Sequence, residues 1–129
     1  MQSKGQTMSI TADLIRGHTD TIILAALLQD DSYGYRINRT LCQLTDGRYE
    51  LKEATLYTAF KRLEEAGYIR SYWGDEATGA RRRYYAITPD GRTAYRQLMQ
   101  EWQEASALIE KLIRFGGDDA APDAGAEQI

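Results

Sequence analysis

The chain has 129 residues, a formal net charge of −3 and a single cysteine, Cys42. This length suits one domain with a core of its own, and a lone cysteine excludes an internal disulfide and fits a reducing compartment. The sequence has no secretory signal pattern and no apolar run near the ~18 residues that span a bilayer, so we expect a cytoplasmic protein without a membrane partner.

The negative charge is concentrated near the C-terminus. Residues 116–129 hold four acidic side chains and no basic one, whereas residues 1–115 hold sixteen basic and fifteen acidic side chains. Any affinity for nucleic acid must therefore come from local basic patches, because the field of the whole chain does not supply it. The Gly, Ala and Asp content of residues 116–129 predicts a disordered acidic tail, and residues 1–10 are expected to form a flexible N-terminus.

Two helices are expected at the start of the chain. The pattern over residues 11–29 predicts a helix with Thr11 as its N-cap and an apolar second half that is buried on several sides. Residues 33–44 predict a second helix with Arg36 and Arg39 on its outward side. The inward residues of this second helix, at helical spacing, are Ile37, Leu41 and Leu44.

A third helix is expected to begin near Lys52 and to end at Gly67, where a left-handed residue is wanted. Its apolar stripe consists of Leu56, Ala59, Phe60 and Leu63. The opposite face is small, rich in hydroxyls and basic, and comprises Ala54, Tyr57, Thr58 and Lys61, with Thr55 and Arg62 on one flank. Small residues let a backbone approach DNA bases, and hydroxyls and amines meet phosphates and base edges. A plain solvated surface is the alternative, but Glu64 and Glu65 stand only in the last turns.

The next segment predicts a β-hairpin. Residues 69–73 and 82–87 are rich in aromatic and β-branched side chains, and residues 74–80 form the connecting loop. Three basic residues follow the loop: Arg81, Arg82 and Arg83. Because side chains alternate along a strand, at least one of them should face away from a bound duplex. Protection of a strand edge by charge is the alternative interpretation.

The acidic residues Asp75 and Glu76 in the loop count against a hairpin tip that enters the minor groove. We therefore expect the base of the hairpin, near Arg82, to contact the DNA backbone. Thr88, Pro89 and Asp90 then supply a capping hydroxyl, a proline at the first helical position and an acid in the first turn, and they predict the start of a helix of roughly 26 residues.

This last helix carries a long apolar seam, made of Leu98, Met99, Trp102, Ala105, Ile109, Leu112 and Ile113. A small domain cannot cover such a seam alone, so we expect it to pack against a second copy of the chain. Trp102 has an ordinary core role as its alternative interpretation. Across a two-fold axis, two facing indoles would instead close on a flat aromatic molecule.

Three helices followed by a hairpin form the winged-helix variant of helix-turn-helix, in which the third helix enters the major groove. The expected fold is therefore mainly α with a small β-hairpin: a winged helix-turn-helix DNA-binding domain over residues 11–88 and one long C-terminal dimerisation helix over 89–115. The candidate DNA-contacting residues are Arg36, Lys52, Thr55, Tyr57, Thr58, Lys61, Arg62, Arg81, Arg82 and Arg83. Without a phosphate loop, a triad signature or a metal-spaced cluster, we expect no enzyme activity, cofactor or metal.

Several short motifs occur together in this order: Thr55-Leu56-Tyr57, Arg62-Leu63-Glu64, Gly67, Ser71-Tyr72-Trp73, Arg82-Arg83-Tyr84-Tyr85, Thr88 and Gly91. On these motifs the chain resembles the PadR family of winged-helix transcriptional regulators, from the first helix to Phe115. Thr58 stands where the family often has proline. Within the family the chain looks most like the small multidrug-sensing repressors, because it has one C-terminal helix bearing a tryptophan.

The resemblance implies a homodimer that represses an efflux or stress operon from a palindromic operator in double-stranded DNA. It also implies a central pore in which planar hydrophobic effectors stack on Trp102 and relieve repression. The remaining pore-lining residues would be Leu14, Asp20, Thr21, Met99, Ser106 and Ile109. Ser106 stands where this group can offer an acid, so a preference for cations stays open. A DNA-binding module without an effector and a protein-interaction adaptor without DNA are the competing hypotheses.

Overall fold

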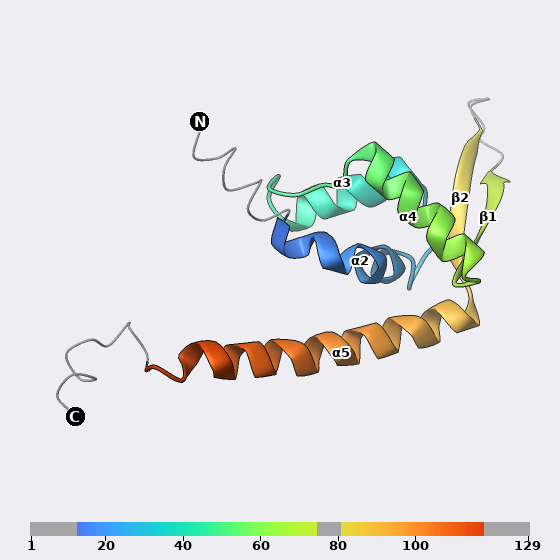
Figure 1. Cartoon of the computed structure of the whole chain (residues 1–129). Coiled ribbons are helices and arrows are strands. Elements are labelled where there is room, and N and C mark those ends of the chain that lie inside the picture. The colour runs from blue at the N-terminus through green and yellow to red at the C-terminus, as the bar shows by residue number, and fades with distance from the viewer. Residues whose placement is uncertain (1–12, 75–80, 118–129) are drawn as a thin grey trace. The chain divides into compact units, whose positions relative to one another are not determined.

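The computed structural model describes residues 13–74 and 81–117. Thr11, the hairpin-loop residues Asp75 and Glu76, the N-terminal residues 1–10 and the tail from 118 onward therefore lie outside the described residues. The described elements are η1 (Arg16–His18), α2 (Thr19–Ala26), α3 (Gly34–Leu44), α4 (Glu53–Glu65), β1 (Ile69–Gly74), β2 (Arg82–Ile87) and α5 (Pro89–Arg114) (Figure 1). This order confirms the expected winged-helix arrangement with a long C-terminal helix.

The first helical segment is less regular than the single helix expected over residues 11–29. A short 3₁₀ helix around Gly17 precedes α2, and the Thr19 hydroxyl donates a hydrogen bond to the carbonyl of Arg16 at 3.0 Å. Glycine weakens a helix interior, and a threonine hydroxyl bound to the backbone competes with helical bonding. At the other end the amide of Leu27 bonds the carbonyl of Leu24 at 3.1 Å, which tightens the last turn and ends the helix at Ala26.

Helix α3 buries Ile37 and Leu41 as expected, but the expectation for Leu44 was wrong. Leu44 is 75 % exposed, and the next buried apolar residues after Leu41 lie in the connection to α4 instead. In that connection Tyr49 and Leu51 are buried, at 7 % and 4 % exposure. Helical spacing alone predicts that Leu44 is buried like Ile37, because spacing takes no account of the loop that follows the helix.

Two side chains hold this connection in place. The Thr45 hydroxyl accepts the amide of Tyr49 at 2.9 Å, and Asp46 and Gly47 turn the chain with φ of 54° and 80°. The Asn38 side chain bonds both backbone groups of Leu51, each at 2.8 Å. The start of α4 is thereby fixed against α3, which sets the direction of the helix that carries the candidate recognition face.

Helix α4 matches its predicted pattern. The apolar stripe is buried, with exposures of 1–2 % for Leu56, Ala59, Phe60 and Leu63. The helix ends before Gly67, whose φ of 82° is the left-handed conformation expected there. Because the whole stripe faces the core, the opposite residues of α4 are left on the surface.

The hairpin is antiparallel, and its register pairs Ile69 with Ile87 and Trp73 with Arg83. On the other edge of β2, Ser32 exchanges two backbone hydrogen bonds with Tyr85, at 3.0 and 2.7 Å. The Tyr85 ring stacks on Phe60 of α4 with ring centroids 3.8 Å apart, and burial raises the Tyr85 pKa. The turn between α2 and α3 and the core face of α4 therefore both anchor the hairpin.

The start of α5 is tied to the end of α4 through Thr88. The Thr88 hydroxyl donates to the carbonyl of Gly67 at 2.7 Å and accepts the amide of Gly91 at 3.0 Å, which confirms its capping role. Gly91 is required by close approach, because a Cβ at this position would lie 2.0 Å from the carbonyl oxygen of Tyr68. Glycine here lets the first turn of α5 pass directly over the backbone of the α4–β1 connection.

The chain divides into two compact units, residues 1–96 and 97–129. The first unit contains the winged-helix core and the first turns of α5, and the second contains the rest of α5. Among the described residues, no helix is both long enough and apolar enough to cross a lipid bilayer.

Candidate nucleic-acid interface

The outward face of α4 presents Tyr57, Thr58 and Lys61 to solvent, with Thr55 also exposed. Tyr57 is fixed on the side of α4 that faces α3. Its ring packs edge-on against Phe60 at 5.5 Å, and a Cβ built on Gly34 would lie 2.8 Å from its hydroxyl oxygen. Lys61 takes part in none of the ion pairs found in residues 13–74 and 81–117. Its ammonium group is therefore available for an anionic partner.

The opposite flank of α4 is different, because Arg62 forms an ion pair there with Asp20 of α2. Nη2 of Arg62 contacts one carboxylate oxygen of Asp20, and Nε donates to the other at 3.3 Å. This hydrogen bond is the main cause that raises the pKa of Arg62. The expected DNA contact Arg62 and the expected effector contact Asp20 thus meet each other in this structure.

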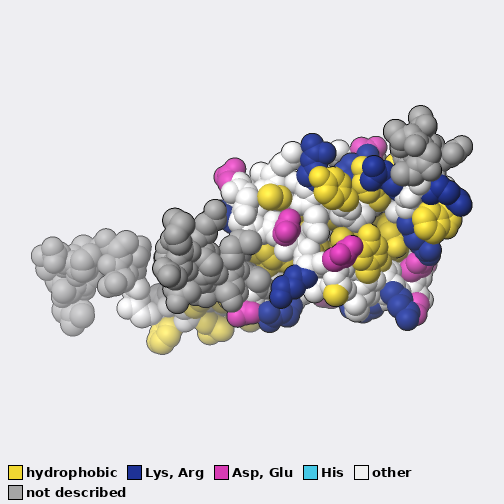
Figure 2. Space-filling model, turned by 90° about the horizontal axis from the view of Figure 1, so that it is seen from above, with side chains coloured by type: hydrophobic (Ala, Val, Ile, Leu, Met, Phe, Trp, Pro, Cys, Tyr) yellow, Lys and Arg dark blue, Asp and Glu magenta, His cyan; other side chains and the backbone are white. Residues whose placement is uncertain are grey.

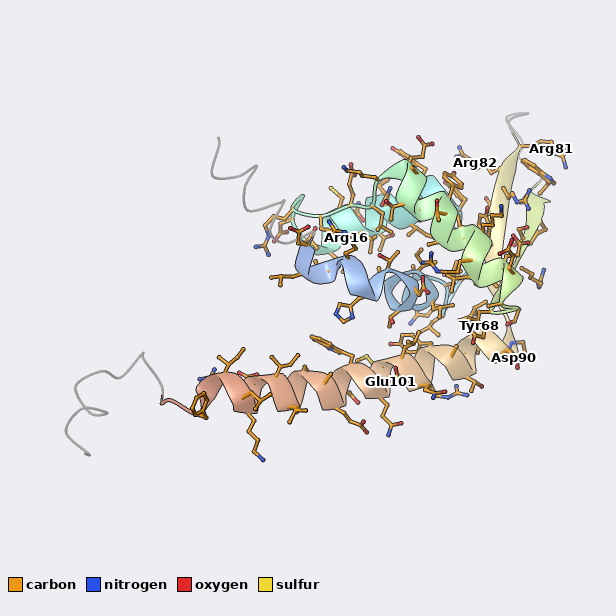
Figure 3. All side chains as sticks on the ribbon, viewed as in Figure 1. Arg16, Tyr68, Arg81, Arg82, Asp90 and Glu101 are labelled. Atoms are coloured by element: carbon orange, nitrogen blue, oxygen red, sulfur yellow. The ribbon has the colours of Figure 1, made fainter. Side chains whose placement is uncertain are left out.

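The three arginines of the hairpin point to different sides, as strand alternation requires. Arg82 lies over the ring of Tyr33, with its Cζ 4.6 Å from the ring centroid, whereas Arg81 and Arg83 lie over Trp73 at 5.1 and 5.7 Å. Figure 3 shows Arg81 and Arg82 at the end of the hairpin remote from Tyr68 and Asp90. Aromatic rings hold these guanidinium groups at defined places, which favours ready-made contacts to a phosphate backbone.

Arg83 has further partners within the protein. Its Nη2 donates to the Ser71 hydroxyl at 2.8 Å and lies 3.9 Å from a carboxylate oxygen of Glu64, and the Ser71 hydroxyl donates to Glu64 at 2.7 Å. This network joins the hairpin to the last turn of α4. Of the three arginines, Arg83 is therefore the one that is bonded to the side chains of Ser71 and Glu64.

On the other face of the hairpin, tyrosines connect it to the α2–α3 turn. Tyr72 and Tyr84 stack with centroids 5.7 Å apart, and Tyr84 packs edge-on against Tyr33 at 5.3 Å. The Tyr72 hydroxyl donates to the Asp31 carboxylate, and this bond raises the Tyr72 pKa. The hairpin is thus held at both faces, so Arg81 and Arg82 belong to a braced element.

Arg36, another expected DNA contact, is engaged close to its own helix. Its Nε donates to the Ser32 hydroxyl at 3.1 Å, its Nη2 donates to the carbonyl of Asp31, and its Cζ lies 5.0 Å from the Tyr33 centroid. Arg36 therefore stands beside Arg82 around one tyrosine ring. The two cations form a short basic edge where α3 begins.

The candidate DNA contacts did not include two further exposed residues of α3, Tyr35 and Arg39, although the sequence placed Arg39 on the outward side of this helix. They line a groove between α3 and the start of α4 together with Lys52 and Tyr57. Tyr35 is 67 % exposed although tyrosine is commonly half-buried. Their spacing of four residues, on the side opposite the buried face of α3, is the signal that could have identified them. Figure 2 shows Lys and Arg side chains, in dark blue, beside exposed hydrophobic ones, in yellow, on the part of the surface not covered by the grey atoms.

The residues expected to bind an effector fall into both units. Leu14, Asp20 and Thr21 belong to residues 1–96, where Leu14 is 75 % exposed and Thr21 is half-buried. In the second unit, a hollow along α5 is lined by Trp102, Ser106, Ile109, Glu110, Ile113, Arg114 and Gly117. Met99 is half-buried and does not line it.

The apolar seam of α5 is largely exposed in the single chain. Leu98 and Met99 are half-buried, whereas the exposed fractions reach 44 % for Trp102 and 61 % for Leu112. The other seam residues, Ala105, Ile109 and Ile113, are exposed as well. Exposed apolar side chains in a continuous row mark a surface for another molecule.

Comparison with known proteins gives consistent results. Residues 23–97 match the model of the transcriptional regulator PadR-like family. A solved structure of a transcriptional regulator from Clostridium thermocellum is 50 % identical, with a TM-score of 0.71, and the match covers 77 % of this chain and 96 % of that one. A PadR family transcription regulator from Clostridium difficile is 32 % identical, with a TM-score of 0.65 and coverage of 74 % and 98 %.

A relative known from its sequence is an uncharacterised protein from Lysinibacillus sphaericus. It is 42 % identical over 101 residues, which make up 78 % of this chain and 93 % of that protein. The likeness therefore extends over most of the length of each relative.

Proposed function

The chain belongs to the PadR-like family of transcriptional regulators and is a DNA-binding regulator rather than an enzyme, and on this premise we propose that it is a homodimeric repressor released by a planar aromatic effector. The observation that carries the proposal is the pairing of two surfaces. One is the polar, basic face of α4 beside the arginines of the hairpin, and the other is the largely exposed apolar seam of α5.

On the DNA side, α4 lies in the major groove with Tyr57, Thr58 and Lys61 toward the bases and phosphates. Lys52 at the start of the helix and Thr55 on its flank lie at the border of this contact. Arg81 and Arg82 of the hairpin meet the DNA backbone, with Arg36 beside them. The support for this arrangement is the exposure of these residues and the bracing of the hairpin by aromatic rings.

The seam of α5 supplies the dimer contact. Packing two seams against each other removes the exposed surface of Trp102, Ile109, Leu112 and Ile113 from water, which is the main driving force for association. A two-fold dimer presents two copies of α4, so the operator is palindromic and its half-sites lie roughly one helical turn of DNA apart or a multiple of it.

The effector site is built around Trp102 on α5. Its indole is an exposed flat apolar surface on the wall of a hollow, and a second indole across the dimer axis would complete a sandwich for a planar compound. Ser106 lines the same hollow, and its hydroxyl donates to the carbonyl of Gln103 at 3.2 Å. The proposal that the regulated genes form an efflux or stress operon is supported only by the resemblance of the sequence motifs to the small multidrug-sensing repressors.

One experiment separates this proposal from its competitors. Fluorescence anisotropy measures binding to the DNA upstream of the protein's own gene at several salt concentrations, with and without a flat aromatic dye that does not bind DNA. Salt-dependent binding that the dye reverses supports the proposal. Binding that the dye leaves unchanged indicates a module without an effector, and absence of binding indicates an adaptor without DNA.

Trp102→Ala is the matched control for the dye. The variant should remain a folded, DNA-binding dimer and lose its affinity for the dye, because the indole supplies a stacking surface. A variant dimer that binds the dye as well as the original protein would remove Trp102 from the effector site.

A further inference from the structure

Asp20 and Arg62 come from distant parts of the sequence and meet at the edge of the recognition helix. Asp20 lies in the first turn of α2, where a negative charge is favoured by the helix dipole, and Arg62 lies in the last turn of α4. Both carboxylate oxygens of Asp20 face the guanidinium group of Arg62, through Nη2 and Nε. The side chains are 37 % and 53 % exposed, so the pair lies at the surface.

In this pair Asp20 accepts hydrogen bonds from the edge of the Arg62 guanidinium group that could otherwise bind a DNA phosphate. Arginine recognises phosphate and carboxylate groups through the same pair of adjacent N–H donors. While Asp20 occupies these donors, Arg62 offers a phosphate neither its best hydrogen bonds nor a net positive charge. Lys61, its neighbour on α4, makes no ion pair in the described part of the chain, so unlike Arg62 it keeps its positive charge available for a phosphate.

We propose that Asp20 is a positioning residue for DNA binding, which holds Arg62 toward α2 and keeps it out of the contact between α4 and the duplex. This inference rests on the proposed role of α4 in DNA binding. Its consequence concerns specificity. Phosphate contacts strengthen binding to every sequence, so withholding one arginine lowers non-specific affinity and leaves the residues that read bases unchanged.

A simple structural brace between α2 and α4 is the alternative explanation, and it predicts something different. Loss of a brace lowers the thermal stability of every variant that lacks the pair and changes DNA affinity in the same direction for each. Under our proposal, removing Asp20 raises DNA affinity, whereas removing Arg62 leaves DNA affinity nearly unchanged. Only removal of Asp20 releases a cation.

The experiment compares four variants of the full chain with the original protein: Asp20→Asn, Arg62→Gln, the double variant Asp20→Asn/Arg62→Gln, and Lys61→Gln. Binding to a short random-sequence DNA duplex is measured by fluorescence anisotropy over a range of salt concentrations. Thermal unfolding by circular dichroism checks that each variant is folded.

We expect Asp20→Asn to bind roughly threefold more tightly than the original protein at low salt, with a salt slope steeper by about one unit, as one added phosphate contact requires. Arg62→Gln should stay within about twofold of the original protein, because its cation is already engaged. The double variant should also return to the original affinity. This last result excludes a general effect of removing one negative charge near DNA.

Two results would overturn the proposal: a loss of affinity in Arg62→Gln as large as that in Lys61→Gln, or a double variant that keeps the gain of Asp20→Asn. Unchanged affinity in Asp20→Asn would overturn it as well. Lys61→Gln tests the proposed function separately. If this variant is folded and binds DNA like the original protein, α4 is not the DNA-contacting helix, and the assignment of that surface fails first.

Discussion

Helices α4 and α5 carry apolar residues at the same helical spacing, yet the two rows have opposite environments. On α4, Leu56 and Phe60 are buried at 2 % and 1 % exposure, whereas on α5, Leu112 and Ile113 are 61 % and 72 % exposed. The row on α4 is covered by α2, α3 and the hairpin of the same chain. Periodicity therefore identifies a surface that must be buried, and the rest of the fold decides whether its partner is inside or outside the molecule.

The largest expected effect comes from placing a charge in the row on α5. Leu112→Glu should yield monomers that no longer bind the operator, because a carboxylate cannot be buried between two apolar helices without a partner. Size-exclusion chromatography with light scattering and DNA-binding assays measure the two losses. Gln103→Glu adds the same charge on a different side of α5 and should retain both properties. A dimeric Leu112→Glu protein would show that another surface joins the subunits.

Equivalent truncations on the two helices test the difference directly. Leu63→Ala on α4 should lower the free energy of unfolding by about 2–5 kcal/mol, because Leu63 is 2 % exposed and its removal leaves a cavity. This loss should not depend on protein concentration. For Leu112→Ala on α5, the loss measured by urea denaturation should shrink as the protein is diluted, because the residue is buried only in the dimer. Equal, concentration-independent losses would contradict the distinction.

The stability of the connection between α4 and α5 depends on the absence of a side chain at Gly91. Gly91→Ala should cost about 1–3 kcal/mol, because the added Cβ would overlap the carbonyl oxygen of Tyr68, a backbone atom that cannot rotate away. Gly116→Ala is the matched control, since a Cβ at Gly116 meets nothing within 4 Å. Thermal denaturation of both variants measures the difference. A Gly91→Ala protein as stable as the control would mean that the start of α5 shifts without cost.

A smaller effect is expected within the hairpin itself. Arg82→Ala should weaken binding to operator and random DNA alike, by roughly threefold at low salt, because a phosphate contact carries no sequence information. Arg83→Ala should weaken binding less, because Arg83 is already bonded to Ser71 and close to Glu64. Anisotropy titrations on both duplexes measure the two variants. A loss confined to operator DNA would contradict a phosphate role for Arg82.

Features that depend on neighbours in the sequence could be predicted from the sequence. The buried stripe of α4, the left-handed Gly67 and the capping hydroxyl of Thr88 are all local patterns, and the structure confirms them. The alternation of the hairpin arginines is local in the same sense. These elements place the candidate DNA-binding surface on α4 and the hairpin.

Features that depend on distant segments could not be predicted in this way. Leu44 has the spacing of a core residue but is exposed, and the next buried residues are Tyr49 and Leu51 of the loop that follows. Asp20 and Arg62 are separated by 42 positions, and no periodicity relates two helices that far apart. Arg62 was a candidate from the outward face of its helix and Asp20 only from the family resemblance, and neither argument indicated that the two residues bind each other.

The hydroxyl of Thr88 has a mechanical consequence. It donates to the carbonyl of Gly67 just after α4 and accepts the amide of Gly91 in the first turn of α5, so it joins the ends of the two helices directly. The direction in which α5 begins is therefore set by the end of α4, and a substitution at Thr88 should release one helix from the other.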